Sequence, residues 1–327
     1  MSLRATRFLA FALLSAASGR LAWGEQVVPR PRIIGLSHVA LWVKDLAKSR
    51  EFYKGYLGFD EPYSLGNADG KTSLAWIKIN DRQSVELFPL SGKPPEGGDS
   101  LYHLALETDD ARAMLAYLIS KGVHGPGGKP LAPTVARGRI GNLNFFAEDP
   151  DRHTVEFVQY EPSGWTLQNA GRFLPKSRIS ARMSHVGITV KDLGKSLAFY
   201  RDILGLAETL RGSSDGITLS WVTERLPESN DYIELMLLRA TPSTDQLHVL
   251  HHFCLEVGDA GAAAEALGKR TLPAGCRPSD PIRTGRNRKR QVNCYDPDGT
   301  RVEIMDATTV DGQPAPPSGA PAPAAWN

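Results

Sequence analysis

The chain has 327 residues, of which 41% are hydrophobic and 23% are charged, with a formal net charge of +2. These values are typical of a globular protein of about two domains. They give no support for a general nucleic-acid-binding surface, which would need a clustered basic face.

The first 24 residues differ from the rest of the chain. "MSLRATR" is a basic start, "FLAFALLSAAS" is an apolar run, and "AWG" places small residues before a cleavage site. We expect a signal peptide over 1–24 and an exported protein, periplasmic or secreted. Its removal takes away three arginines and no acid, so the net charge becomes −1. The apolar run is short for a bilayer span, and we expect no stable membrane insertion.

The first repeating unit is predicted over 33–90. "HVALWV" is typical of a strand, and Asp45 is a predicted helix N-cap for a helix that ends at Gly58. Strands are expected at 73–80 and 83–90, and a Pro/Gly-rich break follows at 91–99. A second unit over 100–160 repeats the order, with "LYHLALET", a helix over 109–122, "NLNFFAE", a "DPDR" turn and "HTVEFVQY".

The second half of the chain repeats the first. "SHVALWVKDLAKSREFYKGYLGF" (37–59) returns as "SHVGITVKDLGKSLAFYRDILGL" (184–206), with 13 of 23 positions identical. After a linker over 161–182, a domain over 183–306 contains units at 183–240 and 248–306. Residues 307–327 are Pro/Ala-rich and are expected to form a disordered tail. The sequence therefore predicts an α+β protein of four βαβββ modules in two homologous halves, 33–160 and 183–306.

Each module places one histidine on its first strand and one glutamate on its last. Successive spacings are 48, 17 and 53 residues in the first half and 49, 18 and 51 in the second. The eight residues are His38, Glu86, His103, Glu156, His185, Glu234, His252 and Glu303.

Small residues share the strand face of these histidines, as with Ala40 beside His38 and Cys254 beside His252. The glutamates stand in apolar frames such as "VELF", where an ionised carboxylate is costly unless it is paired or bound to a metal. We expect a divalent ion, zinc, nickel, iron, cobalt or manganese, held by these side chains. One histidine or glutamate alone would more often be structural, so the prediction depends on the repeat.

The pattern resembles the vicinal oxygen chelate superfamily, which contains glyoxalase I, extradiol dioxygenases and the fosfomycin and bleomycin resistance proteins. The resemblance rests on the two "SHV…LG" stretches and, in part, on "HHFCLEVGD" (251–259). It implies paired modules that curl into cup-shaped mixed sheets, with metal ligands on first and last strands. The modules could pair one with two and three with four, or one with four and two with three, and the second pairing would regroup the eight ligands.

The resemblance also implies chemistry. It favours a glyoxalase-like lyase or isomerase that acts on a small oxygenated substrate through a metal-chelated enediolate, with Glu156 and Glu303 as the catalytic bases by analogy. Export would separate such an enzyme from cytosolic glutathione. The alternatives are an extradiol iron dioxygenase using His185, His252 and Glu303, and a non-catalytic protein that binds small molecules. The protein is expected to be a monomer or homodimer.

A basic run, "RTGRNRKR" (283–290), precedes the last strands. Arg286 and Arg288 are candidates for binding an anionic substrate, although a solvated loop has the same composition. Trp42 and Trp76 could line a site. The three cysteines, Cys254, Cys276 and Cys294, match no zinc or redox motif and would allow one disulfide.

Overall fold

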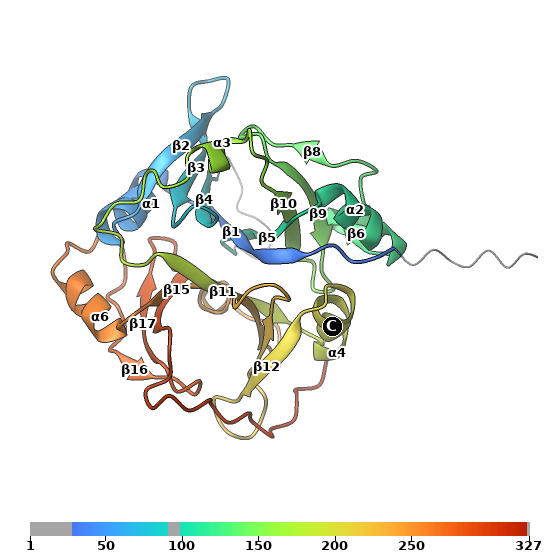
Figure 1. The fold of residues 1–327 in the computed structure, drawn as a ribbon. Coiled ribbons are helices and arrows are strands. Elements are labelled where there is room, and N and C mark those ends of the chain that lie inside the picture. The colour runs from blue at the N-terminus through green and yellow to red at the C-terminus, as the bar shows by residue number, and fades with distance from the viewer. Residues whose placement is uncertain (1–27, 91–98, 326–327) are drawn as a thin grey trace, which may run out of the picture.

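The computed structural model describes residues 28–90 and 99–325. The expected signal peptide (1–24) lies outside the described residues. Figure 1 shows two similar halves side by side, the first running from blue to green and the second from yellow-green to red. Each half is built on one eight-stranded sheet that curls around an interior.

The sheet of the first half contains eight strands. They are β1 (Ile33–Val43), β2 (Asp60–Gly66), β3 (Thr72–Lys78), β4 (Ser84–Pro89), β5 (Leu101–Thr108), β8 (Ala136–Arg137), β9 (Leu143–Glu148) and β10 (Thr154–Gln159). A separate short hairpin consists of β6 (His124–Gly125) and β7 (Lys129–Pro130). The helices of this half are α1 (Leu46–Arg50), the π-helical η1 (Glu51–Tyr56), α2 (Ala111–Ser120), the 3-10 turn η2 (Pro126–Gly128) and α3 (Trp165–Gln168).

The second half repeats this set. Its strands are β11 (Arg182–Val190), β12 (Ala207–Gly212), β13 (Trp221–Arg225), β14 (Tyr232–Leu237), β15 (His252–Val257), β16 (Arg283–Thr284), β17 (Arg290–Tyr295) and β18 (Arg301–Asp306). Its helices are α4 (Leu193–Leu197), the π-helical η3 (Ala198–Ile203), α5 (Thr244–Leu250) and α6 (Ala260–Gly268).

The strand order settles how the modules pair. The first sheet has the order β2-β3-β4-β1-β5-β10-β9-β8, and the second has the order β12-β13-β14-β11-β15-β18-β17-β16. In the first, β1 is parallel to β4 and antiparallel to β5, and β5 is parallel to β10. Module one therefore shares a sheet with module two, and module three with module four. The predicted α+β fold of four modules in two mixed, cup-shaped sheets is confirmed.

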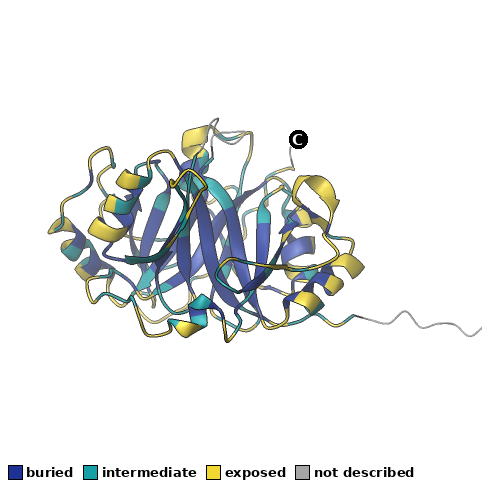
Figure 2. Ribbon diagram, turned by 90° about the horizontal axis from the view of Figure 1, so that it is seen from above, coloured by how far each residue is buried: buried dark blue, intermediate teal, exposed yellow. Residues whose placement is uncertain are grey.

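The first helix begins after the predicted N-cap Asp45, whereas the second, predicted over 109–122, spans Ala111–Ser120. The side chain of Asp45 accepts hydrogen bonds from the backbone N–H groups of Ala47 and Lys48, and Asp110 caps α2 in the same way through Ala113. Such caps satisfy N–H groups that have no partner within the helix. The strands are buried in the middle of the molecule, and exposed residues lie on the surrounding helices and loops (Figure 2).

Reciprocal contacts join the two halves. The buried Tyr53 of η1 donates its hydroxyl to Asp296 Oδ2 at 3.1 Å, and Tyr200 of η3 donates to Asp149 Oδ2 at 2.9 Å. Each tyrosine thus reaches the "DPD" turn of the other half. The turns match in backbone as well, because Arg152 has φ +74° where Gly299 has φ +92°. The left-handed region is costly for arginine and free for glycine.

The chain ends on the second half. Residues 307–325 contain no helix or strand among those that the structure describes. They run along the second sheet, where the Ser318 N–H donates to Arg211 O and the Leu219 N–H donates to Pro321 O, each at 2.8 Å. The three cysteines are free thiols, so the disulfide that their number would allow is not formed. Within 28–90 and 99–325, no helix is long and apolar enough to cross a membrane.

One buried carboxylate weakens the second sheet. Glu224 on β13 is fully buried, and neither of its carboxylate oxygens has a hydrogen-bond partner among the described residues. Its register counterpart in the first half is Ile77, since Glu224 pairs with Ile233 as Ile77 pairs with Val85. Burial, with the nearby Glu208 as the second cause, raises the pKa of Glu224 to about 7.

Glu224→Ile is expected to stabilise the protein. The folded state holds the extra proton, so the contribution of Glu224 is favourable below about pH 4.5 and is lost as the pH rises through about 7. We expect a gain in unfolding free energy on the order of 1–3 kcal/mol at pH 8, and a smaller gain at pH 5. Urea unfolding at the two pH values measures it, with Ile77→Glu as the reciprocal, destabilising control. A gain independent of pH would contradict this account.

Candidate metal centres

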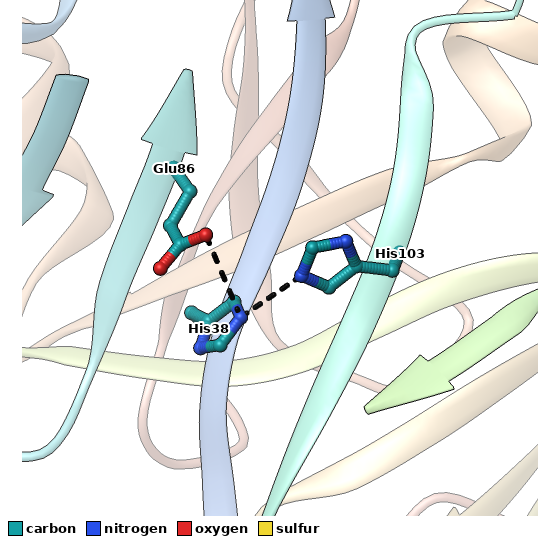
Figure 3. Close-up of side chains that lie close together, drawn as sticks. All are labelled: His38, Glu86 and His103. Atoms are coloured by element: carbon teal, nitrogen blue, oxygen red, sulfur yellow. Dashed lines mark hydrogen bonds and ion pairs between the residues drawn. The ribbon is translucent and has the colours of Figure 1, made fainter. Parts of the chain in front are cut away.

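Four neighbouring strands of the first sheet carry the first set of candidate ligands. His38 lies on β1, Glu86 on β4, His103 on β5 and Glu156 on β10. The register places them on one face, because Ala40 pairs with both Glu86 and His103, while Ala105 pairs with both His38 and Glu156. Figure 3 shows His38 between Glu86 and His103, with the three side chains directed toward one another.

The four side chains converge. His38 Nε2 lies 3.0 Å from both His103 Nε2 and Glu156 Oε2, and His103 Nε2 lies 3.1 Å from the same carboxylate oxygen. Glu86 Oε2 is more distant, 3.8 Å from His38 Nε2. His38, His103 and Glu156 are buried, whereas Glu86 is half-buried. The sequence-predicted quartet of the first half is therefore one cluster.

In this cluster, opposite charges shift the pKa values of the side chains more strongly than burial does. Burial lowers the pKa of His38, but Glu86 and Glu156 raise it more strongly, to about 9. Burial raises the pKa of Glu156, while His38 and His103 hold it far below its usual range. The cluster thus attracts positive charge, as expected for two carboxylates that face a shared position.

Three supporting residues were not found by sequence reasoning. Asn144 on β9 donates to Glu156 Oε1 at 2.6 Å. The Ser37 hydroxyl lies 3.0 Å from His38 Nδ1 and 2.7 Å from the Tyr160 hydroxyl. The only available signal for Asn144 was strand alternation, which places a polar side chain on the inward face of "NLNFFAE".

The first cluster lies at a cavity of about 220 Å³. Its lining includes His38, Glu86 and Glu156 together with Trp76, Phe88 and Phe146. The expectation that Trp76 lines a site agrees with this position. Trp42 instead packs on Tyr102, with ring centroids 4.4 Å apart.

The second sheet carries the second quartet. His185 Nε2 lies 3.2 Å from His252 Nε2 and 3.2 Å from Glu303 Oε2, and His252 Nε2 lies 3.2 Å from Glu234 Oε2. Burial raises the pKa of Glu303, but His185 lowers it to about 2. The His252 Nδ1–H donates to Leu250 O at 2.7 Å, which leaves its Nε2 lone pair directed at the cluster.

The cavity of the second half has different walls. It measures about 310 Å³, and its lining includes Glu234, Glu303, Trp221, Arg283, Arg286 and Arg301. Of the two predicted substrate-binding arginines, Arg286 lines this cavity. Arg288 instead forms an ion pair with Asp311 of the C-terminal segment.

The donors in both clusters fit a divalent metal ion. In each, two imidazole nitrogens and a carboxylate oxygen lie close together around one position, with a second carboxylate beside them. A proton can be shared by only two of these donor atoms at a time, whereas a metal ion can contact all of them. Imidazole and carboxylate together suit zinc, iron, nickel, cobalt or manganese.

The fold and the two clusters define a duplicated protein of cup-shaped βαβββ sheets with a His/Glu centre in each cup. A model of the Glyoxalase/Bleomycin resistance protein/Dioxygenase superfamily matches residues 35–157 and again 182–304, and the chain belongs to this superfamily.

Curated relatives include enzymes of more than one reaction. The chain is 22% identical over 315 residues to glyoxalase I of Saccharomyces cerevisiae, covering 83% of this chain and 91% of that protein. It is 25% identical over 195 residues to a lactoylglutathione lyase of Schizosaccharomyces pombe, and the match covers 51% of this chain and 58% of that protein. The chain therefore matches less than two thirds of the length of this lyase. It is 30% identical over 137 residues to the mitochondrial methylmalonyl-CoA epimerase of Homo sapiens, covering 38% and 74%.

Solved structures share the fold. The Mn(II)-bound glyoxalase from Novosphingobium aromaticivorans has a TM-score of 0.63 at 16% identity, covering 84% of this chain and 83% of that one. An extradiol ring-cleaving dioxygenase from B. fuscum has a TM-score of 0.61 at 18% identity, covering 91% and 77%. At these identities the likeness shows the fold alone.

Paired substitutions test which ligands share a centre. After dialysis against Zn²⁺, the wild type is expected to hold about two equivalents per chain, and His38→Ala about one. His38→Ala with Glu156→Ala should still hold about one, because both residues belong to one cluster. His38→Ala with His185→Ala should hold none, because each change disables a different cluster, and His185 belongs to both donor groups of the second half. Elemental analysis measures the metal content; equal contents in the two double variants would contradict the grouping.

Proposed function

We propose that the protein is an exported, metal-dependent enzyme of the glyoxalase type, a lyase or isomerase that acts on a small substrate with two neighbouring oxygens. The observation that carries this proposal is the convergence of two histidines and two glutamates at a cavity in each cup. Export would separate the enzyme from cytosolic glutathione, and we therefore propose a substrate that lacks this thiol.

Proton transfer is the step that the residues support. A divalent ion held by the cluster would supply a Lewis acid, which makes a C–H bond next to a carbonyl more acidic. Glu156 is the proposed base in the first cup: it takes the proton from one carbon and returns it to the neighbouring carbon, while the hydroxyl proton moves to the neighbouring oxygen, so that no atom is gained or lost. Removal of a proton from carbon is the shared first step: an isomerase returns it to the neighbouring carbon, and an epimerase returns it to the same carbon. A glyoxalase I and an epimerase both occur among the relatives.

The surroundings of Glu156 suit this role. Asn144 donates a hydrogen bond of 2.6 Å to Oε1 of Glu156. The other carboxylate oxygen, Oε2, faces the histidines. Trp76, Phe88 and Phe146 line the same cavity and keep it largely apolar. Electrostatic interactions with the reacting atoms are stronger among apolar walls than in water.

Deuterium exchange tests the proposed proton transfer directly. The mature protein, loaded with Mn²⁺, Ni²⁺, Zn²⁺ or Fe²⁺, is incubated in D₂O with a panel of α-hydroxycarbonyl compounds, and proton NMR follows exchange at the carbon beside the carbonyl. We expect exchange that EDTA abolishes and added metal restores. Glu156→Gln should lower the exchange rate by about 10²-fold or more while the Asn144 contact and the fold are kept.

Matched variants separate the roles of the carboxylates. Glu303→Gln makes the corresponding change in the second cup, and Glu86→Gln changes the more loosely held carboxylate of the first. If Glu86→Gln and not Glu156→Gln removed exchange at equal metal content, the assignment of the base would be wrong. Oxygen consumption with a catechol, or tight ligand binding without exchange by any metal form, would overturn the glyoxalase-type proposal.

The two arginines of the basic run provide a test of substrate charge. Arg286 lines the second cavity, and its one hydrogen bond within 28–90 and 99–325 is a long one, 3.4 Å, to Ser214 O. Arg288 forms an ion pair with Asp311. For an anionic substrate turned over in the second cup, Arg286→Glu should raise KM about tenfold or more with little change in kcat. Arg288→Glu is the matched control. Equal effects of the two changes would contradict a role for Arg286 in binding.

A further inference from the structure

A thiol faces the second cluster at a position where the first has none. Cys254 on β15 pairs with His185 on β11 and with Glu303 on β18, so it lies between two of the candidate ligands in the sheet. It is fully buried, and it stands two residues beyond His252, on the same face of the strand. Its Sγ, a ring nitrogen of His185 and a carboxylate oxygen of Glu303 all lie within 4.8 Å of one another.

The first cup shows what the thiol adds. Ala105 pairs with His38 and Glu156 in the same register in which Cys254 pairs with His185 and Glu303. Ala105 is also fully buried, so the two positions match in strand, face and burial. The first cluster therefore consists of nitrogen and oxygen donors, and the second gains a sulfur donor at an equivalent place.

The ring of His252 occupies space that a side chain fills in the first cup. A Cβ added to Gly187 would lie 2.0 Å from Cε1 of His252, so the His252 ring occupies the space that Ala40 fills with its methyl group in the first cup. His252 is thereby directed toward Glu234, 3.2 Å away. His185 belongs to two groups of donors, one with Glu234 and His252 and one with Cys254 and Glu303.

We propose that Cys254 is a metal ligand of the second centre. Its thiolate, formed by loss of the S–H proton on binding, joins His185 and Glu303 and makes this centre favour thiophilic ions such as Zn²⁺ or Co²⁺. The first centre, with nitrogen and oxygen donors, discriminates less between these ions and Mn²⁺. The two halves of one chain thus hold different metals. This inference rests on the proposed function, because it requires that the clusters bind a divalent ion.

Cobalt spectroscopy tests the ligand without reference to activity. The metal-free mature protein is titrated with Co²⁺, and the near-ultraviolet thiolate-to-cobalt charge-transfer band and the visible ligand-field bands are recorded. We expect about two equivalents bound per chain, only one of which gives the charge-transfer band. Cys254→Ala, which copies the first cup, should remove that band and keep the ligand-field bands of both ions.

Reciprocal and control variants complete the design. Ala105→Cys should add a second charge-transfer band, and His103→Ala should leave the native band unchanged. Cys276→Ser and Cys294→Ser should also leave it unchanged; the Cys294 Sγ contacts Ser279 Oγ at 3.3 Å and is absent from the cluster of donors. In competition between Zn²⁺ and Mn²⁺, Cys254→Ala should lower the Zn²⁺ preference of the second centre by about tenfold or more.

The outcomes separate the two proposals. Binding of two Co²⁺ ions with no charge-transfer band in the wild type would overturn the role of Cys254 and leave the metal-dependent function standing. Failure to bind Co²⁺, Zn²⁺ or Mn²⁺ at either cluster would overturn both. A charge-transfer band that survives in Cys254→Ala but disappears in Cys276→Ser or Cys294→Ser would place the thiolate elsewhere and overturn the inference. Circular dichroism of each variant establishes that it is folded.

Discussion

Burial of charged side chains on the concave face is the constraint on which the rest of the structure depends. His38, His103 and Glu156 are each at most 4% exposed, although together they carry ionisable groups within 3.1 Å of one another. Such a cluster is tolerable only while every member is present and correctly placed, because removal of one partner leaves a charge buried without compensation. A slip of one residue between strands would turn a ligand to the opposite face. The register of β1, β5 and β10 therefore has to be held from outside the cup.

The contacts between the halves supply part of that support. Tyr53 and Tyr200 bind the turns that precede β18 and β10, the two strands that carry the last glutamate of each sheet. The two contacts are alike in geometry but differ in charge. His153 bonds Asp149, and although burial raises the pKa of this carboxyl, His153 lowers it overall. Thr300 stands at the matching place in the second half, where burial and then Asp298 raise the pKa of Asp296 to about 6.

The sequence predicted the modules, their order and the eight candidate ligands, because strand alternation and the repeated spacing are local or periodic signals. It left the pairing of modules open, since both pairings leave the same pattern in the chain, and only the hydrogen bonds between β1 and β5 and between β11 and β15 decide it. Asn144 was missed for a similar reason: its bond to Glu156 depends on how β9 and β10 lie across from each other. Cys254 was recognised as facing the cup, but its distance to His185 and Glu303 depends on two registers together.

The two cups have the same arrangement of two histidines and two glutamates, but different side chains line the cavities around them. Trp76, Phe88 and Phe146 of the first half correspond by register to Thr223, Met236 and Asn293 of the second, so three aromatic rings are replaced by smaller or polar side chains. The second cup adds Arg283, Arg286 and Arg301. Electrostatic interactions are stronger among apolar walls than beside water and mobile charges. The same four candidate ligands therefore lie at an aromatic cavity in one half and at a polar, cationic one in the other. Because the two sets of candidate metal ligands match, the two cups differ in the side chains of their cavity walls and in Cys254. These differences determine which metal ions and substrates each cup can bind.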